Sequence, residues 1–177
     1  MRFGHFSDLH GGSLNLLSSI PLPDCWVCTG DFFPNAGRMG DLAKISPKAE
    51  ITYQNAWWGW KFSKLMKLFG DRPIVCVSGN HDFVSLAQLL KGAAYQGEVF
   101  DIDAEGSCVI NGMTFAGFRE IPWIEGEWNG ECQDLSSVVE QCFDKNPDVL
   151  VTHAPPSGIL CSDKVRGSTV LAGALAY

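Results

Sequence analysis

The segment Ile74-Val75-Cys76-Val77-Ser78-Gly79-Asn80-His81-Asp82 decides the fold of this 177-residue chain. Its first four residues form a short apolar run that is rich in β-branched side chains and bounded by turn residues, which is typical of a buried strand. The run stops at a serine and a glycine, which are followed by an amide, an imidazole and a carboxylate. Because ligands bind just beyond the carboxyl ends of strands in open α/β sheets, this junction predicts a functional site.

Three other short apolar runs end in the same way, each at side chains that can bind a metal ion. We therefore expect four strand ends to meet at one edge of one sheet. Taken singly, an Asp or His at a strand end is more often a cap or a turn residue, so the inference depends on all four runs together. The three runs are Met1–Phe6 before Asp8 and His10, Trp26–Cys28 before Asp31, and Val149–Val151 before His153.

The composition indicates a globular protein, with 46% hydrophobic and 19% charged residues. Thirteen basic and 20 acidic residues give a net charge of −7, which argues against general nucleic-acid binding. No apolar stretch approaches the roughly 20 residues of a membrane span. The sequence also lacks the pattern of a signal peptide. We therefore expect a cytoplasmic protein with no membrane partner.

The order of predicted elements indicates one layered α/β domain over residues 1–177, with a mixed sheet. Asn111-Gly112 between two apolar runs is a strong hairpin signal. Gly70 and Pro73 are typical of the end of a helix. The expected helices span about Ala49–Phe69, Phe83–Lys91 and Cys132–Phe143, the hairpin spans Val109–Phe115, and the expected loops span Phe32–Pro47 and Arg119–Gly130.

Several conspicuous residues have plainer structural interpretations. Cys25-x-x-Cys28 lies in an apolar run and leads into Thr-Gly-Asp, so we interpret it as part of a buried strand rather than a redox or zinc pair. His5 is expected in the core or facing a helix. The cluster Trp57-Trp58-x-Trp60 is expected in the core or at an interface rather than stacked on bases. Arg119 with Trp123 either lines a substrate mouth or belongs to a solvated loop.

The strand-end motifs occur in the order and contexts of a known family. The chain resembles the calcineurin-like metallophosphoesterases, a superfamily of binuclear-metal phosphatases and phosphodiesterases. The resemblance covers essentially the whole chain and implies a layered fold with central mixed β-sheets flanked by helices. The motifs are Asp8-x-His10, Gly30-Asp31, Gly79-Asn80-His81-Asp82 and the later His153.

Hydrolysis of a phosphate ester needs a nucleophile at neutral pH and compensation for charge on the phosphoryl oxygens. Two divalent ions about 3.5–4 Å apart supply both, as a metal-bridging hydroxide and as a clamp on the phosphate. Mixed carboxylate and imidazole ligands suit manganese, iron or zinc. The resemblance therefore implies two divalent metal ions and a phosphate-ester substrate.

The resemblance also implies a role for each motif residue. Asp8 and His10 would bind the first metal, Asp31 would bridge both, and Asn80 and His153 would bind the second. His81 would stabilise the phosphate and protonate the leaving oxygen. Asp82 would orient His81 by accepting its other N–H, although its side chain could instead cap the following helix.

The family pattern ends with a further strand carrying Gly-His-x-His, and this pair is not among the histidines at positions 5, 10, 81 and 153. We therefore expect a C-terminally truncated domain in which each metal lacks one imidazole. An exposed sheet edge could then pair with a second copy of the chain. Two hypotheses follow: a phosphoesterase with weakened metal affinity, or a metal-poor remnant of the fold that acts as a binding or scaffold protein.

Overall fold

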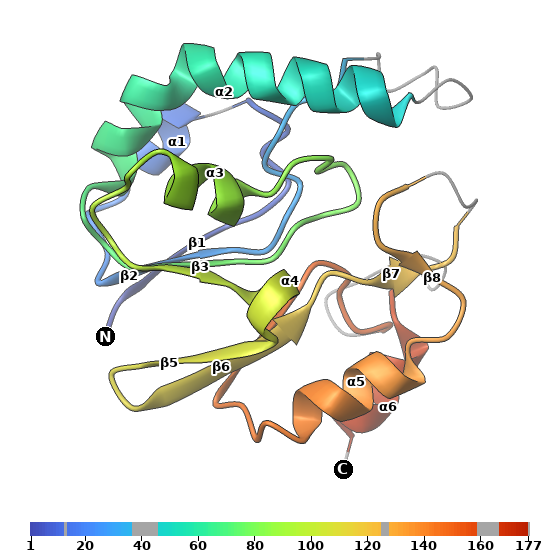
Figure 1. The fold of residues 1–177 in the computed structure, drawn as a ribbon. Helices are drawn as coiled ribbons and strands as arrows, with labels where there is room; N and C mark the ends of the chain where they lie inside the picture. The colour runs from blue at the N-terminus through green and yellow to red at the C-terminus, as the bar shows by residue number, and fades with distance from the viewer. Residues whose placement is uncertain (13, 37–45, 125–127, 159–166, 177) are drawn as a thin grey trace.

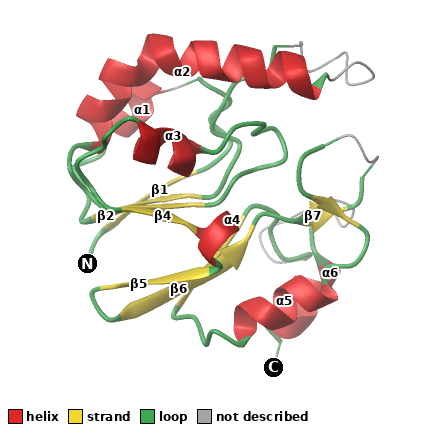
Figure 2. Ribbon diagram, in the orientation of Figure 1, coloured by secondary structure: helices red, strands yellow, loops and turns green. Residues whose placement is uncertain are grey.

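Two β-sheets lie against each other at the centre of the molecule, and helices cover their outer faces (Figure 1). The computed structural model describes residues 1–12, 14–36, 46–124, 128–158 and 167–176. Figure 2 shows the resulting order of layers, from helices through two sheets to helices. This arrangement agrees with the expected layered α/β fold.

The first sheet is entirely parallel and has the strand order β1-β2-β3-β4. All four residues of β2 are buried, because helices cover one face of this sheet and the second sheet covers the other. Cys25 and Cys28 therefore belong to a buried strand, as expected. The strands are β1 (Phe3–Phe6), β2 (Cys25–Cys28), β3 (Ile74–Cys76) and β4 (Val99–Asp101).

The second sheet has the order β5-β6-β9 and is mixed. β5 (Ser107–Ile110) and β6 (Met113–Phe118) form the expected antiparallel hairpin. Its turn residues Asn111 and Gly112 have φ of 50° and 79°, the positive values that a tight hairpin turn requires. β9 (Val149–Thr152) pairs with β6 in parallel.

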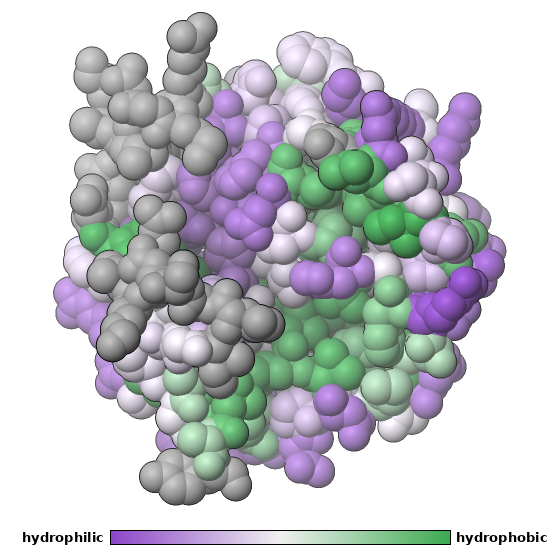
Figure 3. Space-filling view, turned by 180° about the vertical axis from the view of Figure 1, so that it is seen from behind, coloured by the Kyte–Doolittle hydropathy of each residue, from purple (hydrophilic) through white to green (hydrophobic). Residues whose placement is uncertain are grey.

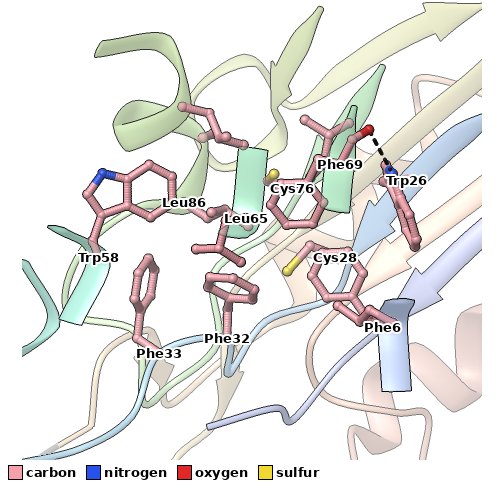
Figure 4. Close-up of a cluster of buried hydrophobic side chains, with 14 of the residues drawn as sticks. Phe6, Trp26, Cys28, Phe32, Phe33, Trp58, Leu65, Phe69, Cys76 and Leu86 are labelled. Carbon is pink, nitrogen blue, oxygen red and sulfur yellow. Dashed lines mark hydrogen bonds between the residues drawn. The ribbon is translucent and has the colours of Figure 1, made fainter. Parts of the chain in front are cut away.

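Three helices cover the outer face of the first sheet: α1 (Leu14–Ser18), α2 (Pro47–Phe69) and α3 (Leu86–Gly92). Aromatic side chains dominate the core between them and the sheet (Figure 4). In this core Trp26 Nε1 donates to the Phe69 carbonyl oxygen at 3.2 Å.

The outer face of the second sheet packs against α5 (Ser136–Phe143) and α6 (Thr169–Ala174). α4 (Ile102–Glu105) joins β4 to β5. A small parallel pair of strands, β7 (Ile121–Pro122) and β8 (Glu131–Cys132), lies to one side (Figure 1).

The structure corrects the expectation of a single sheet. β1, β2 and β3 belong to the first sheet, but β9 belongs to the second. β7 also falls within the segment Arg119–Gly130, which was expected to be a loop. Residues 37–45 of the expected loop Phe32–Pro47 lie outside the described residues.

Individual residues also differ from expectation. His5 is exposed on the edge strand β1, and its Nε2 lies 2.9 Å from Thr29 Oγ1. Trp57 and Trp58 are buried as expected, whereas Trp60 is 74% exposed on the outer side of α2. Helix α3 begins at Leu86 rather than Phe83, because the Ser85 side chain accepts a hydrogen bond from the Gln88 N–H and caps it.

Apolar and polar areas alternate over the face of the molecule seen in Figure 3. Large apolar side chains exposed at the surface include Leu16, Val109 and Trp123. Among the described helices, none combines the length and the apolar character needed to cross a membrane.

Candidate metal centre

The chain leaves β1 and β2 through unusual backbone conformations. Asp8, His10 and Asp31 have φ of 52°, 44° and 51°, in the left-handed region that side chains rarely adopt. Hydrogen bonds hold the two segments together beyond the strands, from Asp8 N to Gly30 O at 3.0 Å and from His10 N to Asp31 O at 2.9 Å. Such backbone strain is concentrated at functional sites, where the surrounding structure maintains it.

Two glycines allow the ends of β2 and β3 to approach each other. A Cβ on Gly79 would collide with the Asp31 carboxylate. A Cβ on Gly30 would lie 2.8 Å from His153 Nδ1, and Gly30 also has a φ of 97°. The absence of side chains at these positions brings Asp31 and His153 together.

Asp31 lies at the centre of the site, with its side chain only 5% exposed. Its Oδ2 is 3.6 Å from His10 Nε2 and 4.0 Å from His81 Nε2. Its Oδ1 is 3.5 Å from His153 Nε2 and accepts a hydrogen bond from the backbone N–H of His81 at 2.8 Å. The two carboxylate oxygens therefore face different histidines.

These separations suit ligands that share an ion. Two atoms that each lie about 2.0–2.2 Å from one metal are roughly 3–4 Å apart. Ligand atoms of His10, Asp31 and His81 all lie within 4.8 Å of one another. A donor set of imidazole and carboxylate matches manganese, iron or zinc, so His10 and Asp31 fit a divalent metal, with the His81 ring beside them.

The geometry of His153 provides a second test of fit. Its Nδ1 lies 2.8 Å from the Thr29 carbonyl oxygen, to which it can only donate. In the neutral ring Nε2 is then an acceptor, yet it lies 2.9 Å from Asn80 Oδ1. Two acceptors facing each other are stabilised by a cation or a proton between them. His153, Asn80 and Asp31 Oδ1 thus form a candidate ligand set on the second side of Asp31.

Asn35, rather than Asp82, orients His81. Asn35 Oδ1 accepts from His81 Nδ1 at 2.6 Å, which leaves Nε2 facing Asp31. The Asn35 amide is itself fixed, because its Nδ2 donates to Glu50 Oε2 at 3.2 Å. Burial lowers the pKa of His81, while the negative charges of Asp31 and Asp8 oppose this shift.

The expected contact between Asp82 and the His81 ring is therefore a wrong prediction. The Asp82 carboxylate instead accepts backbone hydrogen bonds from Phe33 and Gly79, each at 2.9 Å. Burial raises its pKa to about 7. Asp82 thus joins the loop after β2 to the loop after β3, and the helix-cap alternative does not describe it either, since Ser85 caps α3.

Helix α2 contributes two buried polar side chains that the sequence analysis missed. Glu50 is 3% exposed and accepts from the Ala36 N–H at 2.8 Å as well as from Asn35. Gln54 is fully buried; it donates to the His81 carbonyl oxygen at 2.7 Å and accepts from the Phe83 N–H at 2.8 Å. The sequence held one indication of their burial. Glu50 and Gln54 are spaced i, i+4, so they share a face of α2, and this face also carries the buried Trp57 and Trp58.

The two remaining predicted residues lie at the margins of this group. Asp8 is exposed and accepts a hydrogen bond from the Ser7 hydroxyl, and its charge acts on His81. Arg119 follows β6, and its positive charge lowers the pKa of Asp103 in α4 against the raising effect of burial. The structure thus places Arg119 near α4, and contact with a substrate stays a prediction.

Two stacked sheets flanked by helices, with imidazole and carboxylate groups gathered where parallel strands end, are consistent with a metallophosphoesterase-like fold. The family model of calcineurin-like phosphoesterases matches residues 1–174. The chain therefore belongs to the calcineurin-like phosphoesterase family, a family of hydrolases that typically bind divalent metals. None of the curated proteins compared with the chain matches it.

Proposed function

We propose that this chain hydrolyses phosphate esters with the help of two divalent metal ions. The central position of Asp31 carries the proposal, because its two oxygens face ligand groups on opposite sides. Asp8 and His10 would hold one ion, Asn80 and His153 would hold the other, and Asp31 would bridge them. When bound, the ions supply an activated water and compensate the charge of the phosphate.

His81 would handle the proton of the leaving group. Its Nδ1 is committed to Asn35, so the protonated ring carries its second proton on Nε2, which faces Asp31. A proton held there can pass to the leaving oxygen of an ester bound over the centre. Because the His10 side chain is 29% exposed and that of Asp31 only 5%, substrate would approach from the His10 side.

The test is turnover of 4-nitrophenyl phosphate and bis(4-nitrophenyl) phosphate by the purified chain, with millimolar manganese or with chelator. We expect manganese-dependent hydrolysis and a loss of about 10²–10⁴-fold in kcat for His81→Ala. His5→Ala is the matched control, because His5 lies exposed on β1, and it should retain activity.

The metal content of the dialysed chain, measured by elemental analysis, helps to distinguish a phosphoesterase from a binding or scaffold protein. A chain that retains no metal and gives no turnover at millimolar manganese contradicts the proposal. That result would favour the alternative of a binding or scaffold protein. Equal turnover by wild type and His81→Ala would contradict the role of His81.

A further inference from the structure

We propose that Trp128 is a specificity-determining residue that selects phosphate esters with a planar aromatic leaving group. This inference rests on the proposed function, because it uses the position of the leaving group at His81. Trp128 belongs to none of the strand-end motifs, and it lies between β7 and β8.

Trp128 packs directly against the His81 ring. The two ring centroids are 4.0 Å apart and the planes are tilted by 44°. Trp128 is only partly buried, so it is not wholly enclosed by the protein. An aromatic ring thus lies next to the group that would protonate the leaving oxygen.

The neighbouring residue fixes Trp128 in this position. Asn129 Nδ2 donates to the Asp82 carbonyl oxygen at 2.6 Å, and the Asn129 N–H donates to the Asn80 carbonyl oxygen at 3.2 Å. These hydrogen bonds tie Asn129 to the residues on either side of His81. The indole is therefore held against the same loop that carries His81.

The leaving group must occupy the surroundings of His81. Its oxygen has to come within hydrogen-bond reach of His81 Nε2, so the atoms attached to that oxygen meet the neighbours of the His81 ring. The rings packed against it include His10, with centroids 4.8 Å apart, and Trp128. Of these two, Trp128 offers the larger apolar surface, on which another planar ring can stack or pack edge to face.

Binding of two phosphonates to the manganese-loaded chain tests the proposal without requiring turnover. Phenylphosphonate and cyclohexylphosphonate share a phosphonate and a six-membered ring, but only the first ring is planar. We expect calorimetry to show about 2- to 10-fold tighter binding of phenylphosphonate by wild type. Trp128→Ala should remove this preference, and Trp128→Phe should retain most of it.

Trp60→Ala is the matched control, since Trp60 is an exposed tryptophan on α2, and it should behave as wild type. Inorganic phosphate should bind wild type and Trp128→Ala alike, which also shows that the variant is folded. Trp128→Phe keeps the test decisive if the alanine variant is unstable.

Equal affinities of wild type for the two phosphonates would overturn the inference. The inference would also be overturned if Trp128→Ala bound both phosphonates more tightly by the same factor. The indole would then merely obstruct the site. Absence of turnover with the phosphonate preference intact would instead contradict the proposed function, so the two failures are distinguishable.

Discussion

At the scale of single residues, the position of one proton on His81 is set by a chain of three side chains. Glu50 Oε2 accepts from Asn35 Nδ2 and from the Ala36 N–H, so the nitrogen end of the Asn35 amide faces it. The carbonyl end of Asn35 then faces His81 Nδ1 and requires a proton there. Helix α2 thereby determines which nitrogen of His81 is left to act on a substrate.

Removal of the Asn35 side chain should impair turnover more than metal binding. We expect Asn35→Ala to lower kcat about 10- to 100-fold, because the His81 ring loses the partner that fixes its tautomer and orientation. Manganese affinity, measured by calorimetry, should stay close to that of wild type. NMR of the ring nitrogens should show a mixture of His81 tautomers in the variant.

Asn55→Ala is the control for this experiment, since Asn55 is an exposed asparagine on the same helix. An unchanged kcat in Asn35→Ala would mean that the hydrogen bond to Asn35 does not govern the activity of His81. A parallel loss of manganese affinity would show that Asn35 acts on the metal centre as a whole.

The sequence predicted the candidate ligands better than the residues that position them. Asp31 and His81 stand in recognisable strand-end patterns, so local spacing was enough to single them out. Asn35 and Trp128 reach His81 from about 46 positions away on either side, and no local pattern encodes such contacts. The contact expected of Asp82 failed for this reason, because sequence adjacency to His81 does not make a side chain face it.

At the scale of elements, the strand ends converge although they do not share a sheet. The run Val149–Val151 is short and apolar, which fits a buried strand of either sheet, so the sequence could not assign β9. The pairing of β9 with β6 is what carries His153 to the site from the second sheet. The Asn-Gly hairpin and helix α2 were predictable because turn chemistry and helix length are local properties.

A half-buried carboxylate joins α4 to the end of β3. Asp103 Oδ2 accepts from the Ser78 N–H at 3.0 Å, and burial raises the pKa of Asp103 above its ordinary value of 3.8. The folded carboxyl keeps its proton at pH values where the unfolded one has lost it. Stability contributed by this group is therefore largest below the unfolded pKa and falls as the pH rises through the folded pKa.

Asp103→Asn should flatten this pH dependence. The amide oxygen can still accept from the Ser78 N–H, while the titratable group is removed. Urea unfolding of the chelator-treated chain at a series of pH values, beginning near the ordinary carboxyl pKa of 3.8, should show a smaller loss of stability with rising pH in the variant than in wild type. Asp144→Asn, at an exposed position, is the control. A variant that loses as much stability as wild type over this range would show that the Asp103 carboxyl does not contribute to the pH dependence.

At the scale of the whole molecule, the candidate ligands connect the two sheets. Asp8, Asp31 and Asn80 follow strands of the first sheet, and His153 follows β9 of the second. The core between the sheets is apolar, so the polar contacts at the strand ends close that interface on one side. A metal bound there would hold segments that are far apart in the sequence.

Metal binding should therefore stabilise the entire fold. A ligand that binds only the folded state at a hundredfold excess over its Kd adds about 2.7 kcal/mol, which corresponds to roughly 5–10 °C in Tm for a chain of this size. We expect manganese to raise Tm by about this amount and chelator to reverse the shift, as measured by circular dichroism. His153→Ala should lose most of the manganese-induced rise in Tm, because the ions would no longer connect the second sheet to the first. His5→Ala is the control and should keep this rise. A Tm that is the same with manganese and with chelator, in a chain shown by elemental analysis to contain the metal, would mean that the ions do not hold the two sheets together.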